Sequence, residues 1–193
     1  MCGFSGFLNF NPSLGNPLTL LQKMGSELNH RGPDDSGVWF DSKCGVGLSH
    51  RRLSIIDLSA QGHQPMFSTS GRFVIAFNGE IYNHQELKKE LLHVGVVFHG
   101  SSDTEVLLAA FESWGIRQTL KRCIGMFAFS LWDKKEQTLS LVRDRMGEKP
   151  LYYGWQGKGA KRTFLFGSEL KSLRQHPAWQ GGVDRDSLAN LLR

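Results

Sequence analysis

Cys2 is the first residue whose chemistry needs an explanation. It directly follows Met1 in the opening run MCGFSG. If Met1 is removed, Cys2 carries a thiol nucleophile and a free α-amine together. The pKa values of a free thiol and an α-amine are about 8.5 and about 8, so the amine can accept the thiol proton and act as a general base. The alternative to this catalytic role is a structural one, in which Cys2 packs as a small buried hydrophobic residue, as most cysteines do.

Asn78 and Gly79 can supply hydrogen-bond donors to a developing oxyanion. They stand in RFVIAFNGEIY, a run rich in β-branched and aromatic residues that predicts a strand. An Asn-Gly pair between strands usually forms a type I′ hairpin turn, but here a helical pattern follows within a few residues. An asparagine amide and a neighbouring glycine N–H can instead converge on an oxyanion, and glycine lets the backbone approach a substrate closely.

Asp103 and the pair Arg51-Arg52 can bind charged groups of a ligand. An acid in the first turn of a helix favours the macrodipole, so Asp103 has a structural explanation beside its use in holding a cation. Adjacent arginines on a strand point to opposite faces, so one faces inward, where it must find an anion and can clamp a carboxylate. Together with the thiol and the oxyanion donors, these groups fit a free amino acid that bears an acyl group on its side chain.

Hydrophobic periodicity predicts the elements that must position these residues. The pattern predicts helices with buried leucines, and Asn83 with Glu86 and Ser102 with Glu105 resemble capping boxes at two helix starts. The strands show no regular βαβ alternation, which favours an α+β fold with stacked antiparallel sheets. Helices are expected over 18–28, 84–94 (with Leu87, Leu91 and Leu92 buried) and 103–114, and again from Ser168 and near the end; strands are expected over 3–10, 38–40, 45–56, 72–82, 126–133, 138–144, 151–155 and 163–169.

Composition excludes several classes of function. The 193 residues are 40% hydrophobic, enough for one domain, and they contain neither a signal peptide nor an apolar run that could span a membrane. The three cysteines form no CxxC pair, which indicates a reduced, cytoplasmic protein. The net charge of +5 comes from scattered basic pairs, which favours a solvated surface over nucleic-acid binding. Nucleotide-binding and zinc-protease motifs are absent and the seven histidines are dispersed, so no metal site is expected.

The ordered motifs of the chain resemble a known enzyme family. The motifs are, in order, CGFSG, HRGPDDSG, LSHRRLSIIDLSAQGHQPM, FNGEIYNHQELKKEL, SSDTEVLLAAF, GMFAFSLWD, RDRMGEKPLYYG and FGSELKSL. They are similar to the N-terminal glutaminase domain of glutamine-hydrolysing asparagine synthetases, a class II glutamine amidotransferase within the N-terminal-nucleophile hydrolases. RLSIID with NGEIYN favours this branch over hexosamine-phosphate synthases and phosphoribosyl amidotransferases.

This resemblance implies a four-layer αββα sandwich of two mostly antiparallel sheets and assigns roles to residues. Cys2 would be the nucleophile that forms a γ-glutamyl thioester, and Asn78 with Gly79 would form the oxyanion hole. Arg52 would hold the α-carboxylate of glutamine and Asp103 its α-ammonium. The backbone at Ile55, Ile56 and Glu80 would line the pocket, the loop His30–Asp34 would lie near it, and Cys44 and Cys123 would be structural.

The resemblance also implies a division of the protein into parts. Residues 1–180 would be the glutaminase domain, and residues 181–193 would begin a linker or helix that leads to a C-terminal synthetase domain. ATP and Mg²⁺ would bind only in that absent domain, so no cofactor is expected here. The expected partners are L-glutamine and the synthetase domain, and the resemblance allows for a homodimer.

Two other functions remain open from the sequence. One is a non-catalytic module that binds glutamine through Arg52 and Asp103 without turning it over. The other is an N-terminal-nucleophile hydrolase for a different amide, although the Arg–Asp pair argues for a free α-amino acid.

Overall fold

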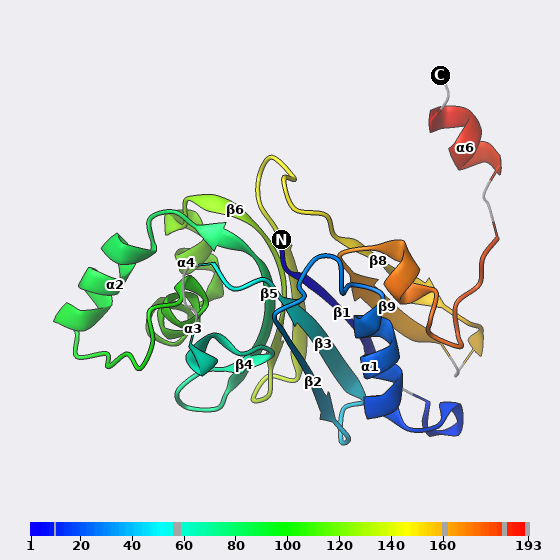
Figure 1. Cartoon of the computed structure of the whole chain (residues 1–193), viewed down its shortest axis with the longest axis horizontal. Coiled ribbons are helices and arrows are strands. Elements are labelled where there is room, and N and C mark those ends of the chain that lie inside the picture. The colour runs from blue at the N-terminus through cyan, green and yellow to red at the C-terminus, as the bar shows by residue number, and fades with distance from the viewer. Residues whose placement is uncertain (10, 56–58, 160–161, 183–184, 192–193) are drawn as a thin grey trace.

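Two antiparallel β-sheets pack face to face at the centre of the molecule, with helices covering both outer faces (Figure 1). The structure is a computed structural model of the chain, and it describes residues 1–9, 11–55, 59–159, 162–182 and 185–191. This arrangement confirms the predicted four-layer αββα sandwich of the α+β class.

The first sheet contains the N-terminal strand, which places Cys2 at its end. Antiparallel pairing runs throughout, with Gly3 opposite Arg51 and Ser5 opposite Gly167. The predicted strand over 45–56 is shorter in the structure and ends at Arg52. The order is β2-β3-β1-β9-β8, formed by β1 (Gly3–Leu8), β2 (Asp35–Asp41), β3 (Val46–Arg52), β8 (Tyr152–Gln156) and β9 (Thr163–Gly167).

The second sheet has two long central strands and a very short edge strand. β5 carries Asn78 and Gly79 in its interior, so the Asn-Gly pair is part of a continuous strand and forms no hairpin turn. Asn78 lies opposite Ala128, and Gly79 lies opposite Phe127. The order is β4-β5-β6-β7, formed by β4 (Met66–Phe67), β5 (Phe73–Ile81), β6 (Gly125–Asp133) and β7 (Thr138–Arg143).

Helices α1 (Pro17–Ser26) and α3 (Asp103–Trp114) bury one apolar face each against a sheet. Leu21 and Met24 of α1 pack with Phe7 on the first sheet, while Leu107 and Phe111 of α3 pack on the second. The helices are α1 (Pro17–Ser26), α2 (His84–His93), α3 (Asp103–Trp114), α4 (Ile116–Arg122), α5 (Leu170–Leu173) and α6 (Arg185–Leu191), with short 3-10 turns at Pro12–Leu14 and Ala60–Gly62.

Three local predictions about the helices were wrong or incomplete. Asn83 makes no capping bond; its side chain instead donates to the Arg122 carbonyl and accepts from the Ile124 N–H, which ties α2 to the start of β6. Leu92 is 52% exposed, because α2 buries only the stripe that contains Leu87 and Leu91. Helix α4 was not predicted, since it is short and follows Gly115 directly.

The second capping box is half confirmed. Ser102 accepts from the Glu105 N–H at 3.2 Å, as predicted. The carboxylate of Glu105 accepts from the N–H groups of His99 and Gly100 rather than returning to Ser102. Glu105 thereby fixes the loop that leads into α3, and that loop places Asp103.

The layer between the sheets determines which strand residues reach the site. Side chains alternate along a strand, and alternate residues from both sheets form the apolar centre of this layer. The same alternation continues to Arg52 on β3 and to Asn78 on β5, so both point between the sheets at one end of the sandwich. The apolar centre is formed by Phe4, Val46, Leu48, Val74, Ala76, Ala128, Trp132 and Phe166.

Two fully buried histidines, His50 and His176, make the stability of the fold sensitive to acid. Burial lowers the pKa of both rings from 6.5 to about 4. His176 packs against Phe7, and its Nδ1 accepts from the Ala178 N–H. Between pH 6.5 and about 4 the unfolded chain binds protons that the folded rings exclude, so stability rises with pH in that window.

We therefore expect the free energy of unfolding to fall as the pH is lowered through this window. Each histidine contributes a slope of up to about 1.4 kcal/mol per pH unit. The substitution His176→Leu should remove about half of the combined slope in urea denaturation, whereas His93→Gln, at an exposed site, should leave it unchanged. An unaltered slope in His176→Leu would contradict the assignment.

Candidate active site

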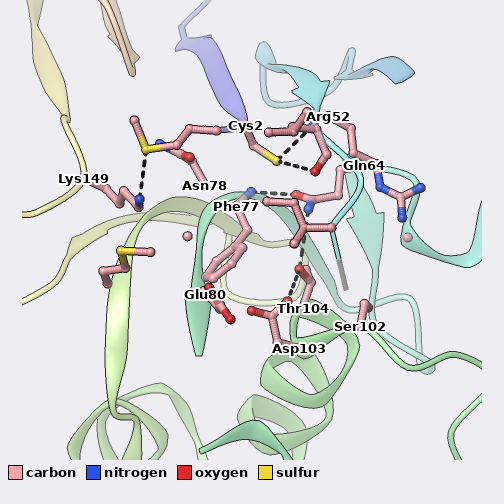
Figure 2. A pocket seen from close by; sticks show the side chains of 16 residues that line it. Cys2, Arg52, Gln64, Phe77, Asn78, Glu80, Ser102, Asp103, Thr104 and Lys149 are labelled. Atoms are coloured by element: carbon pink, nitrogen blue, oxygen red, sulfur yellow. Dashed lines mark hydrogen bonds between the residues drawn. The ribbon is translucent and has the colours of Figure 1, made fainter. Parts of the chain in front are cut away.

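One cavity at the end of the inter-sheet layer gathers the residues singled out from the sequence (Figure 2). Seven of the eight predicted site residues line it; the eighth, Ile56, lies outside the described residues. The chain supplies them from segments far apart in sequence. The seven are Cys2, Arg52, Ile55, Asn78, Gly79, Glu80 and Asp103.

Cys2 sits directly before β1, and its sulfur meets the chain just after β3. The Leu53 N–H donates to Sγ at 3.4 Å, and Sγ lies 3.6 Å from the Leu53 carbonyl oxygen. Arg31 Nε donates to the Cys2 carbonyl at 3.0 Å, while its Nη1 pairs with Glu169 at 2.7 Å. The backbone of Cys2 is therefore anchored independently of its side chain.

Burial sets the protonation state of the Cys2 thiol. Desolvation raises the pKa of the thiol. The Leu53 N–H, the N-terminal amine of Met1 and Arg52 oppose that rise. Because a thiolate is the nucleophilic form, a thiol with a raised pKa needs a base close by. The base that the sequence predicts for this role is an α-amine on Cys2 itself.

Met1 occupies part of the cavity in this chain. Its thioether accepts a hydrogen bond from Lys149 Nζ at 3.0 Å (Figure 2). While Met1 is present, the nitrogen of Cys2 belongs to a peptide bond and cannot act as a base. Removal of Met1 would both vacate this space and create the amine.

The strand β5 directs the Gly79 N–H at the cavity. Across the sheet, Phe127 of β6 exchanges both of its backbone hydrogen bonds with Asp144, so it does not pair with Gly79. The N–H groups of Phe77, Gly79 and Ile81 therefore face the opposite edge of β5. Gln64 accepts from Phe77 and Asp103 accepts from Ile81, which leaves the Gly79 N–H between them at the cavity wall.

Asn78 adds a second donor at the same place. Its side chain is 1% exposed, and its Nδ2 has no hydrogen-bond partner among the described residues. A buried amide N–H without a partner is costly, so this donor is suited to an acceptor that a ligand brings. The Asn78 amide and the Gly79 N–H are thus a donor pair in the cavity that Cys2 also lines.

Glycine is required at position 79 for a packing reason. A Cβ there would lie 2.6 Å from the Phe127 Cα and would overlap the Met126 carbonyl. These are backbone atoms of the paired strand, so they cannot move without separating β5 from β6. The close approach predicted for this glycine is thus made to a neighbouring strand.

Arg52 and Asp103 place opposite charges on the cavity wall, and both side chains are buried. Arg52 Nη1 donates to the Ser59 carbonyl at 2.8 Å. Gly62 makes room for the guanidinium, because a Cβ at Gly62 would overlap Arg52 Nη2. Arg51 points away from the cavity and donates to the Gly32 carbonyl at 3.1 Å, which confirms that the two arginines face opposite sides of β3.

Asp103 begins helix α3 and also holds the end of β5. Its Oδ2 accepts from the Ile81 N–H at 2.9 Å, and Thr104 Oγ1 donates to its Oδ1 at 3.4 Å. Burial raises the pKa of Asp103, although the Ile81 N–H favours the ionised form. A cationic group of a ligand would compensate for this desolvation.

Gln64 and Lys149 line the cavity and were not predicted as site residues. Both lie inside motifs used for the family resemblance, GHQPM and GEKPLYYG, and each precedes a proline. That shared position in a motif was the only signal available, since neither residue has spacing that indicates chemistry. Both side chains are buried in the structure.

Other kinds of site receive no support within the described part of the chain. No group of three His, Cys, Asp or Glu residues there converges to hold a metal ion. No helix among the described residues is long and apolar enough to cross a membrane. Cys44 and Cys123 are free thiols, and burial raises the pKa of Cys123 to about 11.

Comparison with known protein families assigns this chain to one of them. The model of the glutamine amidotransferase domain matches residues 1–193, the whole chain. The chain belongs to this family.

Relatives of this domain include much longer enzymes. Glutamine-hydrolysing asparagine synthetase 3 of Bacillus subtilis is 39% identical over 193 residues, which cover 99% of this chain and 30% of that protein. Glutamine-hydrolysing asparagine synthetase 2 of B. subtilis is 41% identical over 179 residues, covering 92% of this chain and 23% of that protein. The chain thus spans less than a third of the length of these relatives.

A solved structure shares the fold of this domain. Glutamine phosphoribosylpyrophosphate amidotransferase from B. subtilis, complexed with ADP and GMP, superposes with a TM-score of 0.76 at 21% identity. The match covers 92% of this chain and 44% of that one. It confirms the N-terminal-nucleophile-hydrolase-like architecture expected from the sequence.

We expect Gly79→Ala to destabilise the domain, because its methyl group would collide with the backbone of β6. Such overpacking costs about 1–3 kcal/mol, measurable as a lower midpoint in urea denaturation. Gly154→Ala is the matched control, since Gly154 lies in strand β8 with no atom near the added methyl. Equal midpoints for the two variants would contradict the close approach of β5 and β6.

Proposed function

We propose that this chain hydrolyses L-glutamine to glutamate and ammonia, with Cys2 as the nucleophile. The observation that carries the proposal is the convergence of five features on one cavity: a thiol, two free amide donors, a buried guanidinium and a buried carboxylate. Glutamine carries an α-carboxylate, an α-ammonium and a side-chain amide, which match these groups one by one.

Binding fixes the substrate at its amino-acid end. Arg52 holds the α-carboxylate and Asp103 the α-ammonium, while the backbone near Ile55, Ile56 and Glu80 completes the pocket. A charged pair buried in the wall costs desolvation energy in the empty site, and a zwitterionic ligand offsets that cost. An amide that lacks these two charges is expected to bind poorly.

The reaction then proceeds at the side-chain amide. After Met1 has been removed, the α-amine of Cys2 accepts the thiol proton, and the sulfur attacks the amide carbon. The Asn78 amide and the Gly79 N–H stabilise the resulting oxyanion. The C–N bond breaks, the leaving nitrogen takes the proton to depart as ammonia, and water hydrolyses the γ-glutamyl thioester to glutamate.

We further propose that the ammonia supplies a synthetase domain of a longer protein. Support comes from the B. subtilis relatives, which are glutamine-hydrolysing asparagine synthetases of more than three times this length. In this scheme residues 1–180 form the glutaminase domain, residues 181–193 lead towards the synthetase domain, and the acceptor is aspartate or another carboxylate. ATP and Mg²⁺ would act only in that synthetase domain.

The proposed location of the protein is the cytoplasm. Free thiols at Cys2, Cys44 and Cys123 fit the reducing conditions of that compartment.

Replacing Cys2 tests the chemistry directly. We expect Cys2→Ala to lower the rate of glutamate release from glutamine by about a thousandfold or more, since no other group can form the thioester. Cys44→Ala is the matched control and should retain full activity. An uncleaved peptide fused before Cys2 should also abolish activity, and intact-mass spectrometry should show that the active chain lacks Met1.

Unchanged turnover in Cys2→Ala would overturn the proposed mechanism. A folded wild-type chain that binds glutamine, lacks Met1 and still releases no glutamate would favour the non-catalytic binding module instead.

The role of Arg52 can be tested without removing it. We expect Gly62→Ala to raise KM for glutamine about tenfold, because its methyl group displaces the guanidinium and weakens a charge-assisted hydrogen bond. The displaced atom ends a flexible side chain, so the melting temperature should change little. Gly154→Ala controls for the added methyl, and an unchanged KM in Gly62→Ala would contradict carboxylate binding by Arg52.

A further inference from the structure

Where the edge of β5 faces the cavity, no strand of the described residues lies beside it. Strand β4 has only two residues, Met66 and Phe67, and these pair with Ile75 and Val74. Beyond Ile75 the edge of β5 continues for six residues without a strand partner among the described residues. Buried backbone N–H and C=O groups must nevertheless be paired, so something else has to satisfy them.

Two buried side chains replace the missing strand at Phe77. Gln64 Oε1 accepts from the Phe77 N–H at 2.7 Å (Figure 2), and the ring of His50 lies with Nε2 2.9 Å from the Phe77 carbonyl oxygen. Gln64 is 5% exposed and His50 is 1% exposed. One side chain thus acts as the carbonyl of an absent strand and the other as its N–H.

The tautomer of His50 follows from this geometry. A carbonyl oxygen can only accept, so His50 carries its proton on Nε2 and donates it to Phe77. Its Nδ1 has no partner among the described residues. Because burial lowers the pKa of His50 to about 4, the ring stays neutral at physiological pH.

The bond to Phe77 bears directly on the donor pair. The Phe77 carbonyl and the Asn78 N–H belong to one peptide plane, which His50 holds on one side and Ala128 of β6 holds on the other. The orientation of that plane sets the direction in which the Asn78 side chain leaves the strand. It also fixes the start of the segment that presents the Gly79 N–H.

We propose that His50 and Gln64 are positioning residues for glutamine hydrolysis, which hold the oxyanion donors Asn78 and Gly79 in place by clamping the Phe77 peptide groups. The inference rests on the proposed function of the cavity. It extends that function to two residues that hold the reacting geometry through the backbone.

Gln64 also links the oxyanion strand to the substrate-binding carboxylate. Since its Oε1 accepts from Phe77, its Nε2 is directed at Thr104 Oγ1, 3.5 Å away, and that hydroxyl donates to Asp103 Oδ1 at 3.4 Å. The hydrogen bonds therefore run in one direction, from Gln64 through Thr104 to Asp103. The contact with Phe77 is the shorter and stronger of the two that Gln64 makes.

Replacement of His50 tests the clamp. We expect His50→Leu in the full chain to lower kcat for glutamate release about 10–100-fold, the usual effect of misplacing catalytic groups, with KM changed less than about twofold because Arg52 and Asp103 remain. His50→Gln should restore most of kcat, since its Nε2 can donate to the same carbonyl. His176→Leu, which also removes a fully buried histidine, should leave kcat unchanged.

Gln64→Met supplies an independent arm of the same experiment. It keeps the length of the side chain but removes the acceptor for the Phe77 N–H, so kcat should also fall. The double variant His50→Leu with Gln64→Met should lose less than the product of the two single effects, because both side chains hold the same residue. Thermal unfolding of each variant separates loss of fold from loss of positioning.

Several outcomes would overturn the inference. These are an unchanged kcat in His50→Leu, no recovery in His50→Gln, or single effects that multiply independently. If His50→Leu does not fold, His50→Gln must still exceed His50→Asn in kcat, since the shorter amide cannot reach the Phe77 carbonyl; equal values would refute the clamp. Absence of glutamate release by the wild-type chain refutes the proposed function itself, whereas an active wild type with insensitive His50 variants refutes only the clamp.

Discussion

The constraint on which the site depends is the requirement that buried backbone groups find hydrogen-bond partners. Strand β5 runs through the centre of the second sheet, yet its neighbour β4 pairs with only two of its residues. Side chains pair with the backbone groups along the rest of this edge. Gln64 accepts from the Phe77 N–H, His50 donates to the Phe77 carbonyl, and Asp103 accepts from the Ile81 N–H. Between them lies the Gly79 N–H, which the proposed mechanism uses as an oxyanion donor. An incomplete sheet edge, which in most proteins invites aggregation, is here the wall of a cavity.

The charged residues of the cavity wall also depend on the way the surrounding elements are arranged. Asp103 holds the strand and faces the cavity at once, and its raised pKa shows that burial makes its ionised form costly. Arg52 reaches the cavity from the other sheet because the alternation of β3 directs it inwards, and Gly62 leaves space for its guanidinium. Opposite charges from strand β3 and helix α3 in one cavity suit a zwitterion, which is the reason for proposing a free amino acid as the ligand.

In the proposed mechanism, Met1 must be removed before the domain can act on its substrate. Its thioether lies against Lys149 inside the cavity, and its peptide bond occupies the nitrogen that would serve as the base. The raised pKa of the Cys2 thiol makes that base necessary. The residue that begins the chain thus masks the group on which the proposed chemistry depends.

The sequence by itself determined the α+β class, most strands, the helices that begin near residues 17, 84 and 103, and seven residues that line the cavity. It did so because strand alternation and helix periodicity are local, and because the family motifs extend over nearly the whole chain. It did not reveal that Asn83 ties α2 to β6 rather than capping the helix, or that Gln64 and His50 serve the site. Only the tertiary structure decided these roles, because they depend on where β4 ends and on which backbone groups that ending leaves unpaired. Such pairings join residues far apart in the chain, and no local pattern of residue types records them.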